Sequence, residues 1–101
     1  MTDVLPAGSL EGKVALVTGS SRGIGADTVR YLAEAGADVV INFRNKAPRA
    51  EKLANELREL GRRVLVVGAD LTDPSSVASM FQAIDAEFGR LDVLVLNASG
   101  G

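Results

Sequence analysis

Short apolar runs alternate with longer amphipathic segments along this sequence. The apolar runs lie at residues 14–18, 38–43, 64–67 and 91–97. Runs that are apolar almost throughout are typical of strands covered on both faces of a parallel sheet. The longer segments carry apolar residues at spacings of three and four and lie at residues 23–37, 45–61 and 72–89. That spacing is the period of an amphipathic helix, so the pattern predicts four strands separated by three helices.

Each predicted helix has an apolar stripe, the face expected toward the sheet, and a start or stop signal. The stripes are formed by Ile24, Val29, Leu32 and Ala33, by Ala50, Leu53, Leu57 and Leu60, and by Val77, Met80, Phe81, Ile84 and Phe88. Gly36 and Gly61 end the first two helices, because glycine adopts the left-handed conformation that commonly closes a helix. Asp73 before Pro74 begins the third, since aspartate caps a helix and proline is favoured in its first turn.

Strands that alternate with helices over short connections predict an α/β fold with a doubly wound parallel sheet, Rossmann-like in type. Right-handed crossovers make all four strands parallel, with helices on both faces of the sheet. The expected strand order is 3-2-1-4, which opens a crevice between strands 1 and 4 at their carboxyl ends. Ligands of such sheets bind in that crevice, so we expect the functional site there.

Composition narrows the classes of function. The 101 residues are 47% hydrophobic and 24% charged, which is typical of one small soluble domain or of a piece of a larger one. A net charge of −2 argues against nucleic acid and anionic membrane as partners, and no apolar run approaches the roughly 20 residues that span a bilayer. The lack of cysteine and histidine excludes disulfides and thiolate or imidazole metal sites, and no metal site is predicted. The first residues lack a secretory pattern, so we expect a cytoplasmic protein.

A glycine-rich turn, VTGSSRGIG at 17–25, joins the first strand to the first helix. Gly19 suits a sharp turn at positive φ, whereas Gly23 and Gly25 allow the backbone to approach a ligand and the helix start to lie near the sheet. The helix start offers unpaired N–H groups and the positive end of the helix dipole to a diphosphate. The alternative is an ordinary tight turn between a strand and a helix that binds no ligand.

Residues 18–25 resemble the TGxxxGxG coenzyme signature of the short-chain dehydrogenase/reductase family. Asp70 resembles the family's aspartate after the third strand, which receives the adenine amino group, and LNASG at 96–100 stands where the family has Asn-Asn-Ala-Gly. The resemblance covers residues 13–99 with its motifs in order, although Leu96 and Ser99 replace the usual Asn and Gly. It implies a coenzyme site formed by Gly19, Ser20, Ser21, Arg22, Gly23, Ile24, Gly25, Phe43, Arg44, Asp70, Leu71, Asn97, Ala98 and Ser99.

The end of the second strand bears on the choice of coenzyme. An acidic residue there holds the ribose hydroxyls of NAD, and Phe43 occupies its place in this sequence. Arg44 and Arg22 can bind a 2′-phosphate through charge-assisted hydrogen bonds, and Ser21 can add a hydroxyl donor. The resemblance therefore implies NADP(H) in preference to NAD(H). The alternatives are that Arg44 is a solvated loop residue and that Asp70 caps the turn that follows it.

The family's catalytic set is a serine, a tyrosine and a lysine four residues after the tyrosine, and residues 1–101 contain no such set. We therefore expect residues 1–101 to be the NADP(H)-binding part of a single short-chain dehydrogenase domain, with the catalytic residues beyond residue 101. The resemblance implies an oxidoreductase that transfers a hydride between NADP(H) and a small carbonyl or alcohol substrate and forms a homo-oligomer, a dimer or a tetramer. The alternative is a dinucleotide-binding module without catalysis, or a truncated relative that lacks the acid/base set.

Overall fold

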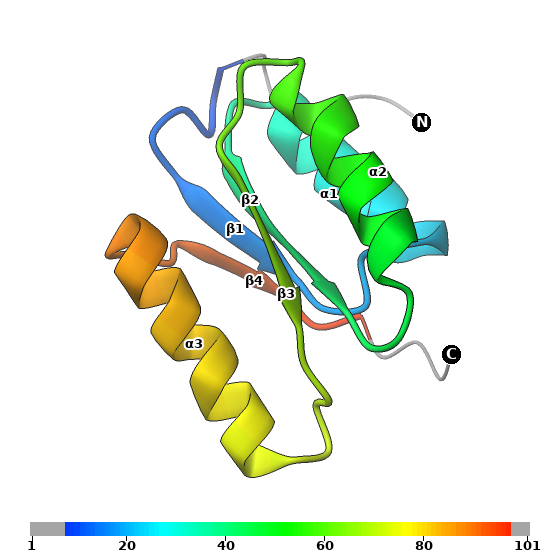
Figure 1. Cartoon of the computed structure of the whole chain (residues 1–101). Helices are drawn as coiled ribbons and strands as arrows, with labels where there is room; N and C mark the ends of the chain where they lie inside the picture. Colours follow the sequence, from blue (N-terminus) through cyan, green and yellow to red (C-terminus); the bar gives the residue numbers. More distant parts are fainter. Residues whose placement is uncertain (1–7, 98–101) are drawn as a thin grey trace.

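The computed structural model describes residues 8–97 and contains the predicted alternation of strands and helices (Figure 1). Its elements are β1 (Val14–Val17), α1 (Gly23–Glu34), β2 (Asp38–Phe43), α2 (Ala47–Arg58), β3 (Val64–Gly68), α3 (Pro74–Phe88) and β4 (Val93–Val95). Among the described residues, no helix is long and apolar enough to cross a membrane.

The sheet is parallel throughout, and its strand order is β3-β2-β1-β4. β1 lies inside the sheet, where Leu16 pairs with Val40 on one side and with Leu94 on the other. The predicted order 3-2-1-4 is therefore confirmed. Because the strands are parallel, their carboxyl ends and the loops that follow them meet at one edge of the sheet.

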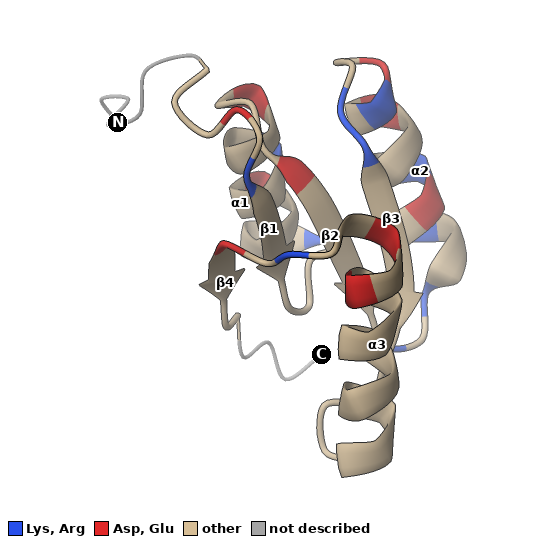
Figure 2. Ribbon diagram, turned by 90° about the vertical axis from the view of Figure 1, so that its left-hand side faces the viewer, with Lys and Arg blue, Asp and Glu red and all other residues tan. Residues whose placement is uncertain are grey.

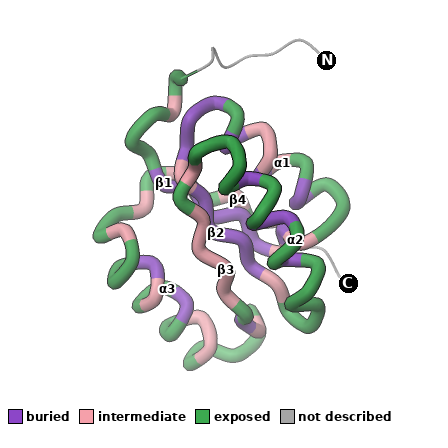
Figure 3. The backbone as a smooth tube through the Cα atoms, turned by 45° about the horizontal axis from the view of Figure 1, so that its top comes forward, coloured by how far each residue is buried: buried purple, intermediate pink, exposed green. Residues whose placement is uncertain are grey.

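Helices cover both faces of the sheet. α1 and α2 lie side by side on one face, and α3 lies alone on the other (Figure 1). Residues of β2 alternate between the two layers: Val39 and Ile41 pack with α1 and α2, whereas Val40 packs with Met80 and Ile84 of α3. Burial of each such side chain contributes about 1.5–3 kcal/mol. β1 and β2 consequently form the buried centre of the molecule, as Figure 3 shows.

The residues predicted to begin or end the helices have the backbone conformation or capping bond expected of them. Gly36 and Gly61 follow the first two helices with φ of +111° and +86°, in the left-handed region that ends a helix. Asp73 caps α3, because its Oδ1 accepts a hydrogen bond of 3.1 Å from the Ser75 N–H.

β4 is shorter than the predicted strand at 91–97. Before it, the Asp92 carboxylate accepts a hydrogen bond of 2.9 Å from the Val14 N–H. After it, the Asn97 N–H donates to Thr18 Oγ1 at 2.9 Å. Side chains add to the backbone bonds at both ends, where the Asp92 N–H donates to the Val14 carbonyl and the Thr18 N–H donates to the Val95 carbonyl.

Three residues of the predicted helical stripes are exposed, which corrects their expected place toward the sheet. Ile24 is 78% exposed because it stands in the first turn of α1, at the carboxyl edge of the sheet. Leu60 is 46% exposed because α2 ends before it. Phe81 is 39% exposed because α3 is the one helix among the described residues on its face of the sheet. The remaining residues of the stripes are buried or half-buried.

Candidate functional site

A cleft of about 500 Å³ opens at the carboxyl ends of the strands, at the edge of the sheet where the fold predicts a ligand. It is lined by Gly19, Ser21, Arg22, Asn42, Arg44, Asn45, Lys46, Arg49, Ala69, Asp70, Leu71, Thr72 and Asn97. These residues come from the loops after β1, β3 and β4, from the end of β2, and from the segment that begins α2. Four of the lining side chains are cationic, and Asp70 is the one carboxylate among the described residues that line the cleft.

The glycine turn has the backbone that its sequence predicts. Gly19 and Gly23 both have φ of +61°, a conformation that other residues rarely adopt. Gly25 is required for a different reason. A Cβ at Gly25 would lie 2.4 Å from the Gly19 carbonyl oxygen and 2.6 Å from Asn97 Nδ2. The start of α1 therefore rests directly on the turn, and no side chain fits between them.

Gly19 is held from two sides by carboxamides. Its N–H donates to Asn42 Oδ1 at 2.9 Å, and its carbonyl accepts from Asn97 Nδ2 at 3.2 Å. Ser20 is fully buried beside it: its N–H donates to the Asn42 carbonyl at 2.9 Å, and its Oγ accepts from the Asn42 N–H at 3.0 Å. Ser20 does not line the cleft, because both its amide and its hydroxyl are used in joining the turn to β2.

The amides that remain for a ligand belong to the first turn of α1. The N–H groups of Gly23, Ile24 and Gly25 have no intrahelical partner, because the first turn of a helix lacks the preceding carbonyls. Arg22 occupies the cap position, and its side chain makes no capping bond. This helix start therefore presents free donors and the positive end of the helix dipole. Gly23, Ile24 and Gly25 do not themselves line the cleft, whereas Ser21 and Arg22, directly before them, do.

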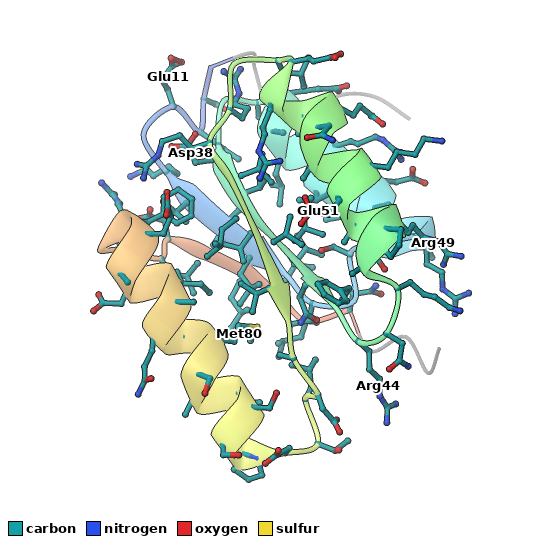
Figure 4. All side chains as sticks on the ribbon, in the orientation of Figure 1. Glu11, Asp38, Arg44, Arg49, Glu51 and Met80 are labelled. Atoms are coloured by element: carbon teal, nitrogen blue, oxygen red, sulfur yellow. The ribbon has the colours of Figure 1, made fainter. Side chains whose placement is uncertain are left out.

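Most cationic side chains of the cleft have no ion pair or side-chain hydrogen bond to the described residues. In the described part of the chain, no ion pair or side-chain hydrogen bond holds Arg22, Lys46 or Arg49, and Arg44 acts on Asp70 through its charge alone. Arg44 and Arg49 extend from the same end of the molecule (Figure 4). α3 carries no Lys or Arg, as Figure 2 shows, so the positive charge of this edge comes from the turn and from the start of α2. Unpaired guanidinium groups at a cleft are suited to an anion.

A second hollow of about 340 Å³ lies beside the cleft, between α1 and α2. Arg22 and Arg49 line both cavities, whereas Lys52 lines the second hollow alone. Arg30 also lines it, but this guanidinium is paired with Glu56 at 2.7 Å and with Asp27 at 3.1 Å.

Phe43 does not line the cleft. Its half-buried ring packs with the core cluster formed with α1 and α2, and it lies against the backbone of Gly68 on β3. A Cβ at Gly68 would lie 2.8 Å from Phe43 Cζ, so the glycine gives the ring its place. The aromatic side chain thus fills the core at the position where a carboxylate was expected in an NAD site, and it brings no charge to the cleft.

Asp70 and Leu71 both line the cleft after β3. Asp70 Oδ1 accepts hydrogen bonds from the Thr72 N–H at 2.9 Å and from Thr72 Oγ1 at 2.7 Å. These bonds, and the charge of Arg44 to a smaller extent, lower the pKa of the Asp70 carboxyl. The carboxylate therefore caps its own turn, which was the alternative interpretation of this residue, and it also faces the cleft. Ala98 and Ser99, the last two residues of the predicted site, lie outside the described residues.

Sequence reasoning missed several residues of the cleft: Asn42, Asn45, Lys46, Arg49, Ala69 and Thr72. Lys46 and Arg49 carried a signal, because they follow Arg44 by two and five residues and are themselves three residues apart, about one helical turn. Asn42 carried a weaker one, as a polar residue near the end of an otherwise apolar strand. Among the described residues, no cluster of acidic, histidine or cysteine side chains could hold a metal ion.

Comparisons with known proteins agree with these features. The family model described as short chain dehydrogenase matches residues 13–101. The chain is 52% identical over 86 residues to cis-4-hydroxycyclohexanecarboxylate dehydrogenase of Sinomonas cyclohexanicum. This match covers 85% of this chain and 34% of the relative. The chain is 43% identical over 112 residues to cyclohexanol dehydrogenase of a Rhodococcus species, covering 100% of this chain and 40% of the relative.

A solved short chain dehydrogenase from Burkholderia cenocepacia, in complex with NADP, superposes with a TM-score of 0.85 and 46% identity, over 89% of this chain and 37% of that one. The chain thus spans between a third and two fifths of the length of these relatives. The resemblance indicated by residues 18–25, 70 and 96–100 is confirmed. The chain belongs to the short-chain dehydrogenase family.

Proposed function

We propose that this chain supplies the coenzyme-binding part of an oxidoreductase that transfers a hydride between NADP(H) and a small carbonyl or alcohol substrate. The observation that carries the proposal is the charge of the cleft. Arg22, Arg44, Lys46 and Arg49 line it against the single carboxylate of Asp70, whose Oδ1 is bonded to the turn. A 2′-phosphate is the feature that distinguishes NADP(H) from NAD(H), and such a cluster is suited to bind it.

The end of β2 supports the same coenzyme. An NAD site at this position uses a carboxylate to hold the ribose hydroxyls, and that carboxylate would repel a 2′-phosphate. Here the side chain of Phe43 is turned into the core against Gly68, so neither the hydrogen bond acceptor nor the repulsion is present. Arg44 follows directly and lines the cleft. Arg22 and Ser21 of the glycine turn line the same cleft, so a second guanidinium and a hydroxyl are available there.

The other parts of the coenzyme follow from the same geometry. The start of α1 would hold the pyrophosphate, because the amides of Gly23, Ile24 and Gly25 have no intrahelical partner. Asp70 and Leu71 would hold the adenine, and Asn97 would hold the nicotinamide ribose. When bound, the coenzyme supplies the hydride-transfer chemistry, whereas the residues of this chain orient it and neutralise its phosphates.

The reaction class rests on the family and on the relatives. Cyclohexanol dehydrogenase, at 43% identity, is named for an alcohol, and the Burkholderia structure holds NADP. The catalytic serine, tyrosine and lysine implied by the family do not occur as a set within residues 1–101, so we assign them to sequence beyond residue 101 of a longer chain. We also extend to this protein the family's dimeric or tetrameric assembly.

The coenzyme assignment is tested by Arg44→Asp in the purified full chain, with Kd for NADPH and NADH measured by titration. The variant should weaken NADPH relative to NADH by about 1.5–3 kcal/mol, the range for hydrogen bonds to charged groups. Lys13→Asp is the matched control, because it makes the same change in charge at the amino end of β1, on an exposed side chain outside the cleft. Equal losses for the two coenzymes, or an equal effect of the control, would contradict the assignment.

A further inference from the structure

Asn42 occupies a position that the coenzyme assignment does not use. Its side chain is 2% exposed, at the end of a β2 strand that is otherwise apolar in its interior. Both polar atoms of the carboxamide have partners: Oδ1 accepts from the Gly19 N–H at 2.9 Å, and Nδ2 donates to the Val67 carbonyl of β3 at 3.4 Å. The side chain therefore links the glycine turn after β1 to the strand on the far side of β2.

We infer that Asn42 is a positioning residue for the pyrophosphate site, acting through Gly19 and the start of α1. Gly19 has φ of +61° and no side chain, so packing of its own cannot hold it in place. The carboxamide of Asn42 takes its N–H, and the carboxamide of Asn97 takes its C=O. The peptide groups on both sides of Gly19 are thereby fixed relative to β2 and β4.

The position of Gly19 is passed on to the phosphate donors by direct contact. Gly25 approaches the Gly19 carbonyl so closely that a Cβ on Gly25 would lie 2.4 Å from that oxygen. Gly25 belongs to the first turn of α1, whose amides have no intrahelical partner and which directly follows Ser21 and Arg22 of the cleft. A shift of Gly19 therefore moves the surface on which these donors rest. The Gly19 N–H itself points into the protein, where Asn42 occupies it, and is not available to a ligand.

The consequence of losing this anchor is a loss of preorganisation. A turn that occupies its binding-competent conformation only part of the time binds with an affinity reduced by that fraction. In Asn42→Ala, a fall of the competent fraction to about one tenth would raise Kd about tenfold for every ligand whose diphosphate sits on α1. Ligands that contact mainly the cations after β2 should be little affected, because Arg44 and Arg49 lie outside the glycine turn and have no bond to Asn42.

The test compares four ligands in the purified full chain: NADPH, NADH, ADP and adenosine 2′-monophosphate. ADP carries the diphosphate and no 2′-phosphate. Adenosine 2′-monophosphate carries a 2′-phosphate and no diphosphate. Asn42→Ala should raise Kd about tenfold for NADPH, NADH and ADP, and should change Kd for adenosine 2′-monophosphate by less than about twofold. The stoichiometry of the last titration also reports the folded fraction. Asn42→Ser serves in the same way if the alanine variant does not fold.

Asp38→Ala is the matched control. Asp38 lies at the opposite end of the same strand from Arg44 (Figure 4), and its Oδ1 likewise accepts a neighbouring backbone amide, that of Arg63, at 2.9 Å. It should leave Kd for all four ligands unchanged. The inference is overturned if Asn42→Ala weakens all four ligands alike, or leaves ADP and NADH unchanged. The inference takes one point from the proposed function, that a ligand's diphosphate binds at the start of α1. Wild-type protein that binds ADP and NADH but does not prefer NADPH would refute the coenzyme assignment and leave the role of Asn42 to be decided by ADP.

Discussion

Gly25→Ala should lower the free energy of unfolding, because the contacts of Gly25 in the folded protein outweigh its helix propensity. Gly25 lies inside α1 with ordinary helical backbone, since it is absent from the glycines with positive φ. In an isolated helix, alanine is more favourable than glycine by about 1 kcal/mol, so local propensity predicts a more stable protein. In the folded protein, the new Cβ would lie 2.4 Å from the Gly19 oxygen, 2.6 Å from Asn97 Nδ2 and 2.9 Å from Ser20 Cα.

The free-energy cost of the steric overlap at Gly25 exceeds the gain in helix propensity. Two of the three contacts are with backbone atoms of a turn that is anchored on both sides, so they cannot be relieved by a side-chain rotation. Overpacking of this kind typically costs about 1–3 kcal/mol. The bond from Asn97 Nδ2 to the Gly19 carbonyl lies in the same space, and its loss adds about 1 kcal/mol. After the gain in helix propensity is subtracted, we expect a net destabilisation of about 1–3 kcal/mol.

Urea unfolding followed by circular dichroism measures this change as a shift of the midpoint at constant slope. Gly61→Ala is the control, because Gly61 has φ of +86° and no atom within 4 Å of an added Cβ. It should lose about 1–2 kcal/mol from backbone strain alone and leave coenzyme affinity unchanged. Gly25→Ala should weaken NADPH and NADH together, because the start of α1 is displaced. A Gly25→Ala protein that is as stable as wild type, or more stable, would refute the account of the turn.

Two further predictions concern charge. Arg49→Gln should reduce the preference for NADPH over NADH by about tenfold, as for one hydrogen bond to a charged group, whereas Lys52→Gln, which lines only the neighbouring hollow, should leave the ratio of the two Kd values unchanged. Equal effects of the two variants would indicate a long-range effect of charge instead of contact. The second prediction concerns Asp92, where hydrogen bonds from Arg90 and from the Val14 N–H lower the pKa of the carboxyl to about 2. A depressed pKa stabilises the fold above the ordinary value near 3.8, and this contribution is lost as the pH falls toward about 2. Wild type should therefore be more stable than Asp92→Asn at neutral pH, and urea midpoints measured against pH should converge between about pH 4 and pH 2; a constant difference would contradict this assignment.

The fold could be predicted because its signals are local. The buried runs that became β1 and β2 are apolar on both faces, and Gly36, Gly61 and Asp73 mark helix ends through their own backbone preferences. Errors occurred where burial depends on neighbours. Ile24 and Phe81 have the spacing of core residues but are exposed, because no element among residues 8–97 covers them.

The candidate site could be predicted in part. Arg22 and Arg44 lie close in sequence to recognisable motifs, and both line the cleft. The pattern around Arg49 predicts only an amphipathic helix, because a periodic pattern shows which face is polar and not which cleft that face borders. Ser20 was assigned to the ligand from its place in a motif, although its bonds to Asn42 use both its amide and its hydroxyl within the fold.

By itself, the sequence determined the order of strands and helices, the parallel sheet, the glycine turn and the family, because these depend on periodicity and on the backbone freedom of single residues. Tertiary structure alone decided which neighbours surround each side chain of the site. It turned Phe43 into the core against Gly68, gathered Lys46 and Arg49 with Arg22 at one cleft, and placed Asn42 against the amide of Gly19. The physical reason is that hydrogen bonds and charges act over a few ångströms, and these residues come within that range only when three strands are laid side by side.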